Sequence, residues 1–473
     1  MGTINSAFNI ISGALEADQS ALNIVANNVA NANTAGYTRQ VPNWQENAPV
    51  QINEISYGTG VSETGPTSVR DRVLEERLAQ QRQAASASTA RLSALDSIQS
   101  LFTPASGSAS SAAGDIGSDI TSLFNSFSSL EGNPTDNALR DQVLSAAHTL
   151  AGDISNAATR LDAQRTSLDQ EAAGITNQVN SLTAAIAQLN VEIQASSPNA
   201  DAGALEDQRQ LELSNLSQLI GINQIATENN GISITTTAGE MLVSEGTSYR
   251  LTDGGENGAT HFFLGTKDIT LSLASGGGQL GGLITARDQD IPQVLAELDQ
   301  LAYGISTQVN GVNNSGSDLN GDTGTAADPL YIFNQPASVV DSARNMTVVM
   351  TDPARIAAAG PAQGSGDNSN ARAMAALATM SIVVGLTPSG FYSDFVTSLG
   401  ATVEQTQSEN TAENASVSQL QTARNSLSSV NLNDEASFMQ QFERSYQAAS
   451  QVFSILNTIM TSAINLGVET AVS

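Results

Sequence analysis

The chain has 473 residues, and its 18 basic residues are outnumbered by 47 acidic ones, so the formal net charge is −29. A surface this acidic repels phosphate backbones, which argues against nucleic-acid binding. The chain contains no cysteine, which excludes disulfides, thiolate catalysis and cysteine-based zinc sites. Its length is sufficient for a sizeable core and for more than one domain.

No apolar run is long enough to cross a membrane, so we expect no membrane insertion. The N-terminal apolar segment lacks a basic n-region and is interrupted by Asn5, Glu16 and Asp18, which does not fit a cleaved secretory signal. If the protein is extracellular, it leaves the cell by a route that reads something other than a cleaved signal peptide.

Near the N-terminus, apolar side chains recur at alternating steps of four and three, and the polar Asp18 takes the one missing place. The stripe predicts a helix that buries one narrow face against a second helix. It then runs into a cluster of asparagines, and Gly36 supplies the permissive backbone that ends helices. The members of the stripe are Ile4, Phe8, Ile11, Leu15, Leu22, Val25 and Val29.

A matching stripe occupies the C-terminal end and predicts the partner of the first helix. A flanking row with the same heptad phase widens its apolar face, so two such helices left unpaired would expose a large apolar surface. Two ordinary amphipathic helices on one globular core would explain the same pattern. The stripe consists of Met439, Phe442, Tyr446, Ala449, Phe453, Leu456, Met460 and Ala463, and the flanking row of Phe438, Val452, Ile459 and Leu466.

Between these ends, residues 41–67 read as extended chain with short strands, in which Trp44 serves as a packing anchor. A helical stretch over 68–102 has a polar, alanine-rich middle (80–90), where we expect loose or wet packing. The low-complexity run Pro104–Gly117 reads as a joint.

The longest helical pattern starts near Thr135 or Asp136 and ends at Pro198. A short loop at 199–203 leads to a second helix, Leu205–Ile220, so the two are expected to form an antiparallel hairpin in an elongated bundle. The stripe of the long helix consists of Leu150, Ile154, Ala157, Leu161, Leu168, Ala172, Ile175, Val179, Leu182, Ile186, Leu189 and Ile193.

From residue 222 the apolar period changes to two, which predicts an inserted antiparallel β domain whose last strand carries Ile269, Leu271 and Leu273. A further helix follows the glycine-rich segment 276–283. This segment lacks the Gly-Lys-Ser/Thr of a phosphate-binding loop.

The sequence offers no convincing catalytic, cofactor or metal site. His148 and His261 have no neighbouring histidine at zinc-binding spacing, and no nucleophile-elbow motif is present. Asp318-Leu-Asn-Gly-Asp322 resembles the start of a calcium loop, but Thr323 and Pro329 stand where the loop needs glycine and glutamate. We therefore expect an Asx-rich turn there, no cofactor, and no enzymatic activity.

The N-terminal run Ala26-Asn-Asn-Val-Ala-Asn-Ala-Asn-Thr-Ala-Gly-Tyr37, with Thr38-Arg39 after it, resembles a motif of the axial proteins of the bacterial flagellum (rod, hook and hook-associated proteins). Ser445-Tyr-Gln-Ala-Ala-Ser-Gln-Val452 is similar to their C-terminal motif. The middle resembles the hook-associated protein 1 family in Asp207-Gln-Arg209, in Gly277-Gly-Gln-Leu-Gly-Gly-Leu-Ile-Thr-Ala-Arg-Asp288 and in Val430-Asn-Leu-Asn-Asp-Glu435.

This resemblance implies a structural subunit that joins the flagellar hook to the filament and assembles through paired terminal helices. The implied partners are further copies in a ring or tube, the hook protein, the next hook-associated junction protein, and an export chaperone at the C-terminal helix. The implied location is extracellular, in the flagellum, reached unfolded through a type III exporter. A rod or hook protein with the same ends is the alternative within the class, and a secreted coiled-coil adhesin or an enzyme on a flagellar scaffold are the alternatives outside it.

We expect a mainly α fold with an inserted antiparallel β domain, in which the terminal helices form a coiled coil beside an elongated bundle and the β domain lies outside. The expected segments are an N-terminal assembly helix (1–40), a three-part bundle (41–221, 276–315 and 371–432), the β insertion (222–275), a loop and short-strand region (316–370) and a C-terminal assembly helix (433–473).

We expect both terminal helices to be poorly ordered until they find partners. We also expect Asn27, Asn28, Asn31 and Asn33 to fix the register between packed helices, as buried asparagines do in coiled coils. The assembly residues expected at the N-terminus are Ile11, Leu15, Leu22, Val25, Asn27, Asn28, Val29, Asn31, Asn33, Gly36 and Tyr37, and at the C-terminus Met439, Phe442, Tyr446, Ala449, Phe453, Leu456 and Met460.

Overall fold

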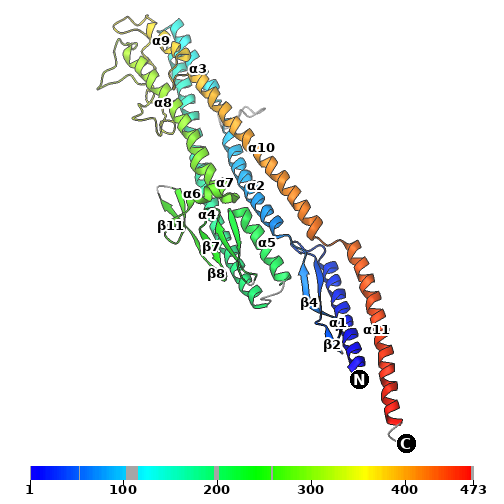
Figure 1. Cartoon of the computed structure of the whole chain (residues 1–473). Coiled ribbons are helices and arrows are strands. Elements are labelled where there is room, and N and C mark those ends of the chain that lie inside the picture. Colours follow the sequence, from blue (N-terminus) through cyan, green and yellow to red (C-terminus); the bar gives the residue numbers. More distant parts are fainter. Residues whose placement is uncertain are drawn as a thin grey trace.

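The protein is elongated, and helices run along most of its length (Figure 1). The computed structural model describes residues 2–52, 54–102, 115–196, 202–228, 230–256 and 259–469. Both chain ends lie at the same end of the molecule, where α1 (Gly2–Asn31) runs beside α11 (Leu432–Glu469). We call these two helices, together with the strands within residues 40–68, the terminal module, and the rest of the molecule the helical body.

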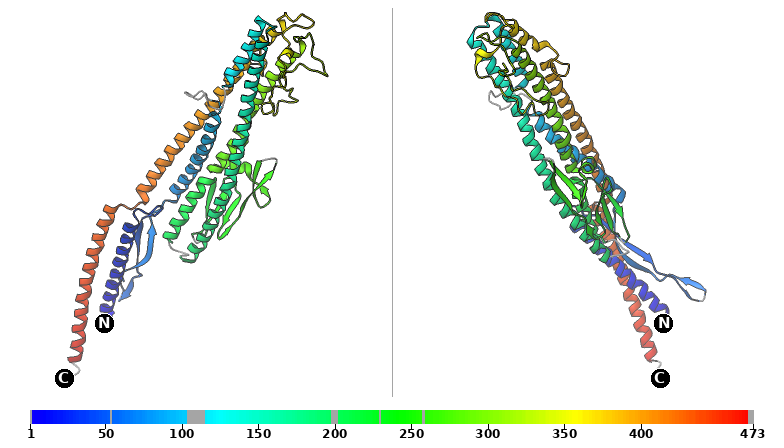
Figure 2. Two further views of the ribbon diagram at one scale, coloured as in Figure 1. Left: turned by 180° about the vertical axis from the view of Figure 1, so that it is seen from behind. Right: turned by 90° about the vertical axis from the view of Figure 1, so that its left-hand side faces the viewer.

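The helical body consists of long helices that lie along the molecule, with short helices between and beyond them (Figures 1 and 2). A π-helical turn, Ala286–Asp290, joins α7 to α8, and 3-10 turns occupy Pro353–Arg355 and Leu377–Thr379. The helices are α2 (Arg72–Gln99), α3 (Ile116–Gly132), α4 (Asn137–Ser196), α5 (Ala204–Leu219), α6 (Thr270–Gly276), α7 (Gly278–Thr285), α8 (Ile291–Ser315), α9 (Ser369–Ala376) and α10 (Pro388–Ser428).

The core of the body follows the stripe that the sequence predicts for its longest helix. In α4, the side chains of Leu150, Ile154, Leu161 and Ile186 are completely buried. The next helix, α5, packs back against α4 as the predicted antiparallel hairpin. Burial of each such side chain contributes about 1.5–3 kcal/mol to folding, which explains how one stripe can hold a helix of 60 residues in place.

The middle of α2 is not loosely packed on all sides, as the sequence had suggested. A Cβ added to Gly282 of α7 would lie 2.2 Å from the backbone oxygen of Ala87, so only glycine permits this close approach. On another side, Asn410 of α10 donates hydrogen bonds to the hydroxyls of Ser88 (3.0 Å) and Thr89 (2.6 Å). A third side does line an open groove of about 1250 Å³, so the small side chains permit both close packing and open space.

The insertion between α5 and α6 forms two antiparallel sheets, one ordered β5-β6-β7-β8 and the other β11-β10-β9. Asn180 of α4 bonds both backbone groups of Leu251, at 2.7 and 2.8 Å, and thereby docks the second sheet on the long helix. The strands are β5 (Ile222–Ala226), β6 (Ile232–Thr236), β7 (Met241–Ser244), β8 (Thr247–Ser248), β9 (Leu251–Glu256), β10 (Ala259–Leu264) and β11 (Lys267–Asp268).

The prediction of a strand that carries Ile269, Leu271 and Leu273 is wrong, because α6 begins at Thr270. Asp268 Oδ1 accepts a hydrogen bond from the backbone N–H of Thr270 (2.8 Å), the first residue of that helix. Ile269 and Leu273 are buried, whereas Leu271 is 83% exposed. The two-residue alternation is therefore a coincidence of one helical turn.

The helix α3 was absent from the sequence prediction, which placed a joint at Pro104–Gly117. Residues 103–114 of that joint lie outside the described residues, and α3 starts directly after them with Asp115 as its N-cap. Ile120, Leu123 and Phe127 of α3 are completely buried. The apolar residues of this segment do recur at helical spacing, which is the signal for α3 in the sequence.

The region 316–370 consists mostly of loops with isolated bridges, such as Phe333 with Val348. Its loops are tied to the long helices by polar contacts. Arg140 of α4, which is buried, donates to the backbone oxygens of Pro134 (2.7 Å) and Ile356 (2.5 Å). Asp318 Oδ1 accepts from the N–H groups of Asn320 and Asp322, which confirms the predicted Asx-rich turn.

Within the described part of the chain, no helix is both long and apolar enough for a membrane crossing.

Candidate assembly interface

The helices α1 and α11 pack as an antiparallel pair along their apolar stripes. Near the free ends, the rings of Phe8 and Phe453 meet edge to face at 5.3 Å. Near the body, Ala21 and Val25 of α1 form a buried cluster with Phe442 of α11. The two ends of the sequence are therefore partners within one chain, and each contributes its heptad stripe to the contact.

This pairing covers only part of the apolar surface of α11. Phe442 is buried, and Ala449, Leu456 and Met460 are half-buried. The other C-terminal residues expected to take part in assembly, and most of the flanking row, remain exposed by 36–58%; they are Met439, Tyr446 and Phe453, with Phe438, Val452, Ile455, Ile459 and Ile464 beside them. One helix is thus too narrow a partner for a stripe this wide.

On α1, the expected assembly residues are distributed in the same uneven way. Val25 is buried, Ile11, Leu15 and Leu22 are half-buried, and Val29 is 40% exposed. The polar residue in the stripe, Asp18, is also buried.

One asparagine of the cluster, Asn28, is built into the packing. Its Nδ2 donates to the backbone oxygen of Gln40 (2.8 Å) and to Glu435 Oε2 (3.0 Å), and its Oδ1 accepts from Tyr37 Oη (2.8 Å) and from Gln40 N (3.0 Å). A single buried amide therefore joins α1 to the strand β1 (Gln40–Glu46) and to α11. Burial, with the negative charges of Asp207 and Glu435 nearby, raises the pKa of Tyr37 to about 12, so this hydroxyl keeps its proton.

The other asparagines serve the end of the helix. Asn31 Nδ2 donates to Asn27 Oδ1 at 2.7 Å, and Asn31 Oδ1 accepts from Thr34. Asn27 and Asn33 are exposed in the single chain. The helix α1 ends at Asn31, and Gly36 adopts a φ of +81° in the turn that follows it. Within one chain, a buried register contact is thus limited to Asn28.

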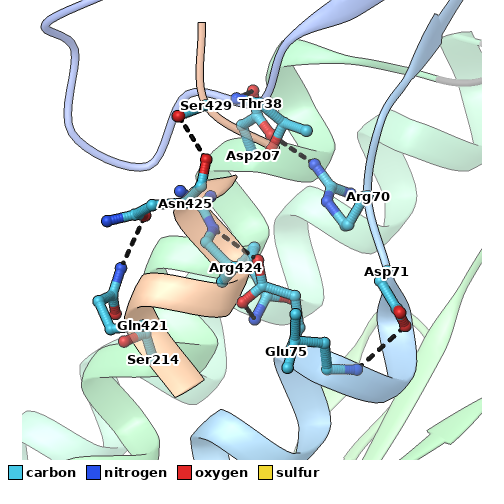
Figure 3. A network of polar contacts seen from close by, with 12 residues as sticks. Thr38, Arg70, Asp71, Glu75, Asp207, Ser214, Gln421, Arg424, Asn425 and Ser429 are labelled. Carbon is cyan, nitrogen blue, oxygen red and sulfur yellow. Dashed lines mark hydrogen bonds and ion pairs between the residues drawn. The ribbon is translucent and has the colours of Figure 1, made fainter. Parts of the chain in front are cut away.

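The terminal module meets the helical body at a group of buried polar residues, which we call the elbow: Thr38, Arg39, Arg70, Glu206, Asp207, Ser428 and Glu435. On one side, Asp207 of α5 accepts from the backbone N–H of Thr38 at 2.9 Å (Figure 3). Arg70 pairs with both Glu206 (2.8 Å) and Asp207, and all three side chains are at most 9% exposed. Charges this deeply buried require close partners, so the elbow holds a fixed geometry.

The other side of the elbow clamps the start of α11. Arg39 Nε donates to Glu435 Oε1 at 2.6 Å, and the backbone N–H of Arg39 donates to the oxygen of Ser428 at 2.9 Å. The guanidinium of Arg39 also lies over the ring of Phe438, 5.3 Å from its centre. The turn that follows α1 is thereby joined to the segment between α10 and α11.

Below the elbow, a second polar layer ties α10 to α2 and α5 (Figure 3). Arg424 Nε donates to Glu75 Oε1 at 2.9 Å, and the side chains are largely buried. Arg82 of α2 donates to Ser214 of α5 and to Gln421 of α10. These contacts hold α2, α5 and α10 together next to the elbow.

The segment Asp207-Gln-Arg209 has two separate connections. Asp207 faces the terminal module, whereas Arg209 Nη1 donates to Asn190 Oδ1 (2.8 Å) and to the backbone oxygen of Asn230 (2.7 Å). Burial lowers the pKa of Arg209 to about 10. One turn of α5 thus links the terminal module, the long helix and the β insertion.

The sequence prediction missed Arg70, Glu206 and Glu435 as interface residues. Glu435 lies within a segment that carries the family resemblance and Glu206 lies next to another, which was the available signal, whereas Arg70 lies outside these segments. The candidates for chemistry lie elsewhere: His148 is exposed on α4, and His261 Nδ1 lies 2.7 Å from Asp268 Oδ2 on neighbouring strands. Among the described residues, no group of three or more potential metal ligands comes together.

Two family models match parts of this chain, and both describe flagellar proteins. A family model described as "Flagella basal body rod protein" matches residues 8–38, which cover most of α1 and the turn after it. A second model, "Flagellar hook-associated protein FlgK helical domain", matches residues 106–327.

The matches with known proteins extend over nearly the whole chain. Flagellar hook-associated protein 1 of Escherichia coli (strain K12) is 25% identical over 98% of this chain and all of its own length. The protein of that name from Bacillus subtilis (strain 168) is 25% identical over 96% of both chains. The hook junction protein FlgK of Burkholderia pseudomallei has the same fold, with a TM-score of 0.63 at 18% identity over 74% of this chain and all of its own. Over nearly its whole length, the chain is therefore similar to the FlgK-type flagellar hook-associated proteins.

Proposed function

We infer that this chain is a structural subunit of the junction between flagellar hook and filament, and that copies assemble through α1 and α11. The observation that carries the proposal is the apolar row of α11 that α1 leaves uncovered. A homopolymer can cover such a row by repeating the same contact between neighbours, and repeated heterologous contacts generate rings and helical tubes.

The energetic argument starts from the free subunit. Without neighbours, the pair buries little apolar surface beyond the elbow, so we expect the free ends of both helices to be partly disordered, whereas the part next to the elbow stays ordered. Each large side chain covered on assembly contributes about 1.5–3 kcal/mol, which offsets the cost of ordering. A shifted register between α1 and α11 is disfavoured, because it would leave the buried amide of Asn28 without these partners.

The elbow has a distinct role in this proposal. It fixes the orientation of the terminal module relative to the helical body through Arg70, Glu206 and Asp207. In an assembled junction, the helical bodies and β insertions then pack outside the terminal modules as a rigid spacer.

The proposed partners are further copies of this chain, the hook protein and the next hook-associated junction protein. An export chaperone at α11 fits the same apolar row before assembly. The proposed location is the extracellular part of the flagellum, reached through the type III exporter without a cleaved signal peptide. We propose no enzymatic activity and no cofactor.

Removing the gene from motile cells tests the proposal. We expect hooks without filaments and unpolymerised flagellin in the medium, and restoration by the full-length chain but not by a chain lacking residues 1–30. The truncated chain must remain folded in its helical body, as judged by circular dichroism. Cells that still grow attached filaments without the gene would overturn the proposed function.

A further inference from the structure

The terminal module contains a second apolar face, at the tip of a β-hairpin that leaves the helices. The long arms of the hairpin are β1 (Gln40–Glu46) and β4 (Val61–Ser68), and its tip consists of β2 (Val50–Ile52) and β3 (Ile55–Tyr57). The hairpin lies along α1 near its base and projects away from the helix pair toward its tip (Figure 2, right).

Close contacts with α1 hold the arms of the hairpin in place. A Cβ added to Gly13 of α1 would lie 2.9 Å from the backbone oxygen of Val61, and one added to Gly60 would lie 3.3 Å from the Cα of Ile10. On the other arm, Trp44 packs edge to face against Phe442 of α11 at 5.8 Å. The direction in which the tip projects is therefore set by the helix pair.

The tip has one apolar and one polar side. Val50 is paired with Tyr57 across the two strands, and Ile55 lies on the same face as Tyr57 because side chains alternate along a strand. These three side chains are 50–57% exposed. The paired residues Gln51 and Ser56 occupy the opposite face. An isolated two-stranded sheet is only marginally stable, so an exposed apolar face on one indicates a surface that a partner covers.

We propose that this hairpin face docks on the uncovered face of α11 in a second copy of the chain. The inference rests on the proposed function, in which copies assemble side by side. An apolar face favours an uncharged partner surface, because a charge buried against it would lose its hydration, and such surfaces are scarce on a chain with a net charge of −29. On α11 no charged residue occurs between Ser445 and Val468, and Val452, Ile455 and Ile459 are 42–58% exposed there.

The position of the hairpin favours a neighbour over the same chain. Its base is fixed to α1 and α11, so its tip cannot fold back on the outer face of its own α11 without breaking those contacts. The arms that carry the tip contact both helices of the pair, so the tip extends the same module. A contact from hairpin to helix is also heterologous, as a ring or tube requires.

Cysteine cross-linking tests the contact directly, because the natural chain contains no cysteine. The variant Ile55→Cys/Ile459→Cys replaces the native protein in motile cells, and isolated flagella are oxidised. We expect a ladder of covalent oligomers of this chain on a non-reducing gel, with most of the protein cross-linked. The matched control, Ser56→Cys/Ile459→Cys, places the thiol on the opposite face and should give at least tenfold less cross-linking.

Intact hook–filament junctions without the ladder would overturn the docking contact, and so would a cross-link to a different protein or equal yields from both variants. A second pair of variants makes the same distinction without thiols. Ile55→Asp/Tyr57→Asp should abolish swimming with no change in the circular dichroism of the monomer, whereas Gln51→Asp/Ser56→Asp should keep it. Normal swimming of the first variant would contradict the docking contact and leave the proposed junction function intact.

Discussion

The terminal module and the helical body use similar apolar stripes with opposite results. In the body, Leu150, Ile154 and Leu161 of α4 are completely buried. In the module, Val452, Ile455 and Ile459 of α11 are 42–58% exposed, although they recur with the same helical spacing. The α4 stripe has several neighbouring elements, whereas α11 packs against α1 and one strand arm. The comparison shows that the number of partners, and not the stripe itself, decides whether a helix belongs to a core or to an interface.

Charge divides the two regions in the same way. The helix α1 contains only Glu16 and Asp18 as charged residues, and α11 has none between Ser445 and Val468. The helical body carries most of the net charge of −29. Repulsion between the acidic bodies, together with the long uncharged stretches of α1 and α11, favours contact between copies at the module.

The largest effect on folding should come from the core of the body. Phe127→Ala removes a completely buried ring and should lower the free energy of unfolding by about 3–5 kcal/mol. Phe453→Ala, at a ring that is 37% exposed, should leave unfolding of the body within about 0.5 kcal/mol of the natural value and still impair assembly. Urea unfolding followed by circular dichroism compares the two. Equal losses would mean that the module belongs to the same core.

A similar loss is expected when the elbow loses its cation. Arg70→Met removes the buried cation that pairs with both Glu206 and Asp207, and loss of one member of a buried ion pair typically costs about 3–5 kcal/mol. We expect the helices of the body to persist while the module loses its fixed orientation. Spin labels at Ser418→Cys on α10 and Ser450→Cys on α11 report this as a broadened distance distribution.

Two further variants complete this test of the elbow. Arg70→Lys should recover part of the narrow distribution, because it restores the charge without the forked geometry. Arg355→Met, which removes a partly exposed ion pair with Asp328 far from the elbow, should change nothing. A narrow distribution in Arg70→Met would show that the elbow does not set the orientation.

A smaller effect is expected at the asparagine cluster. Asn28→Ala leaves the carboxylate of Glu435 and the backbone of Gln40 short of partners and should cost about 1–3 kcal/mol. Trp44, the only tryptophan, lies in the module, so its fluorescence follows the unfolding of this part alone. The matched control Asn33→Ala, at an exposed position, should stay within about 0.5 kcal/mol. Equal costs at both positions would contradict a special role for Asn28.

A pH dependence is expected in the body alone. Burial and the neighbouring Asp153 raise the pKa of Asp119 in α3 from 3.8 to about 7. The folded state therefore holds a proton that the unfolded state releases, so this contribution to stability is present at low pH and is lost as the pH rises to about 7. Asp119→Asn should flatten this decline and raise stability at pH 8. Urea titrations at pH 5 and pH 8 measure it, and an unchanged slope would contradict the assignment.

Local patterns were sufficient to predict the terminal pair, the hairpin of α4 and α5 and the β insertion, because each depends on a long apolar period. They failed at α6, where one helical turn imitates a strand, and at α3, which follows a low-complexity run. The elbow could not be predicted at all. Thr38, Asp207 and Glu435 are far apart in the sequence, and only the packing of α5 and α11 against the linkers brings their polar groups together.

The most direct test of the account changes only the uncovered row of α11. The triple variant Val452→Asp, Ile455→Asp and Ile459→Asp keeps the buried Phe442 and the helical body unaltered. We predict a monomer with unchanged unfolding of the body and, in cells that carry no other copy, hooks without filaments and free flagellin in the medium. Attached filaments of normal number in those cells would contradict assembly through this surface.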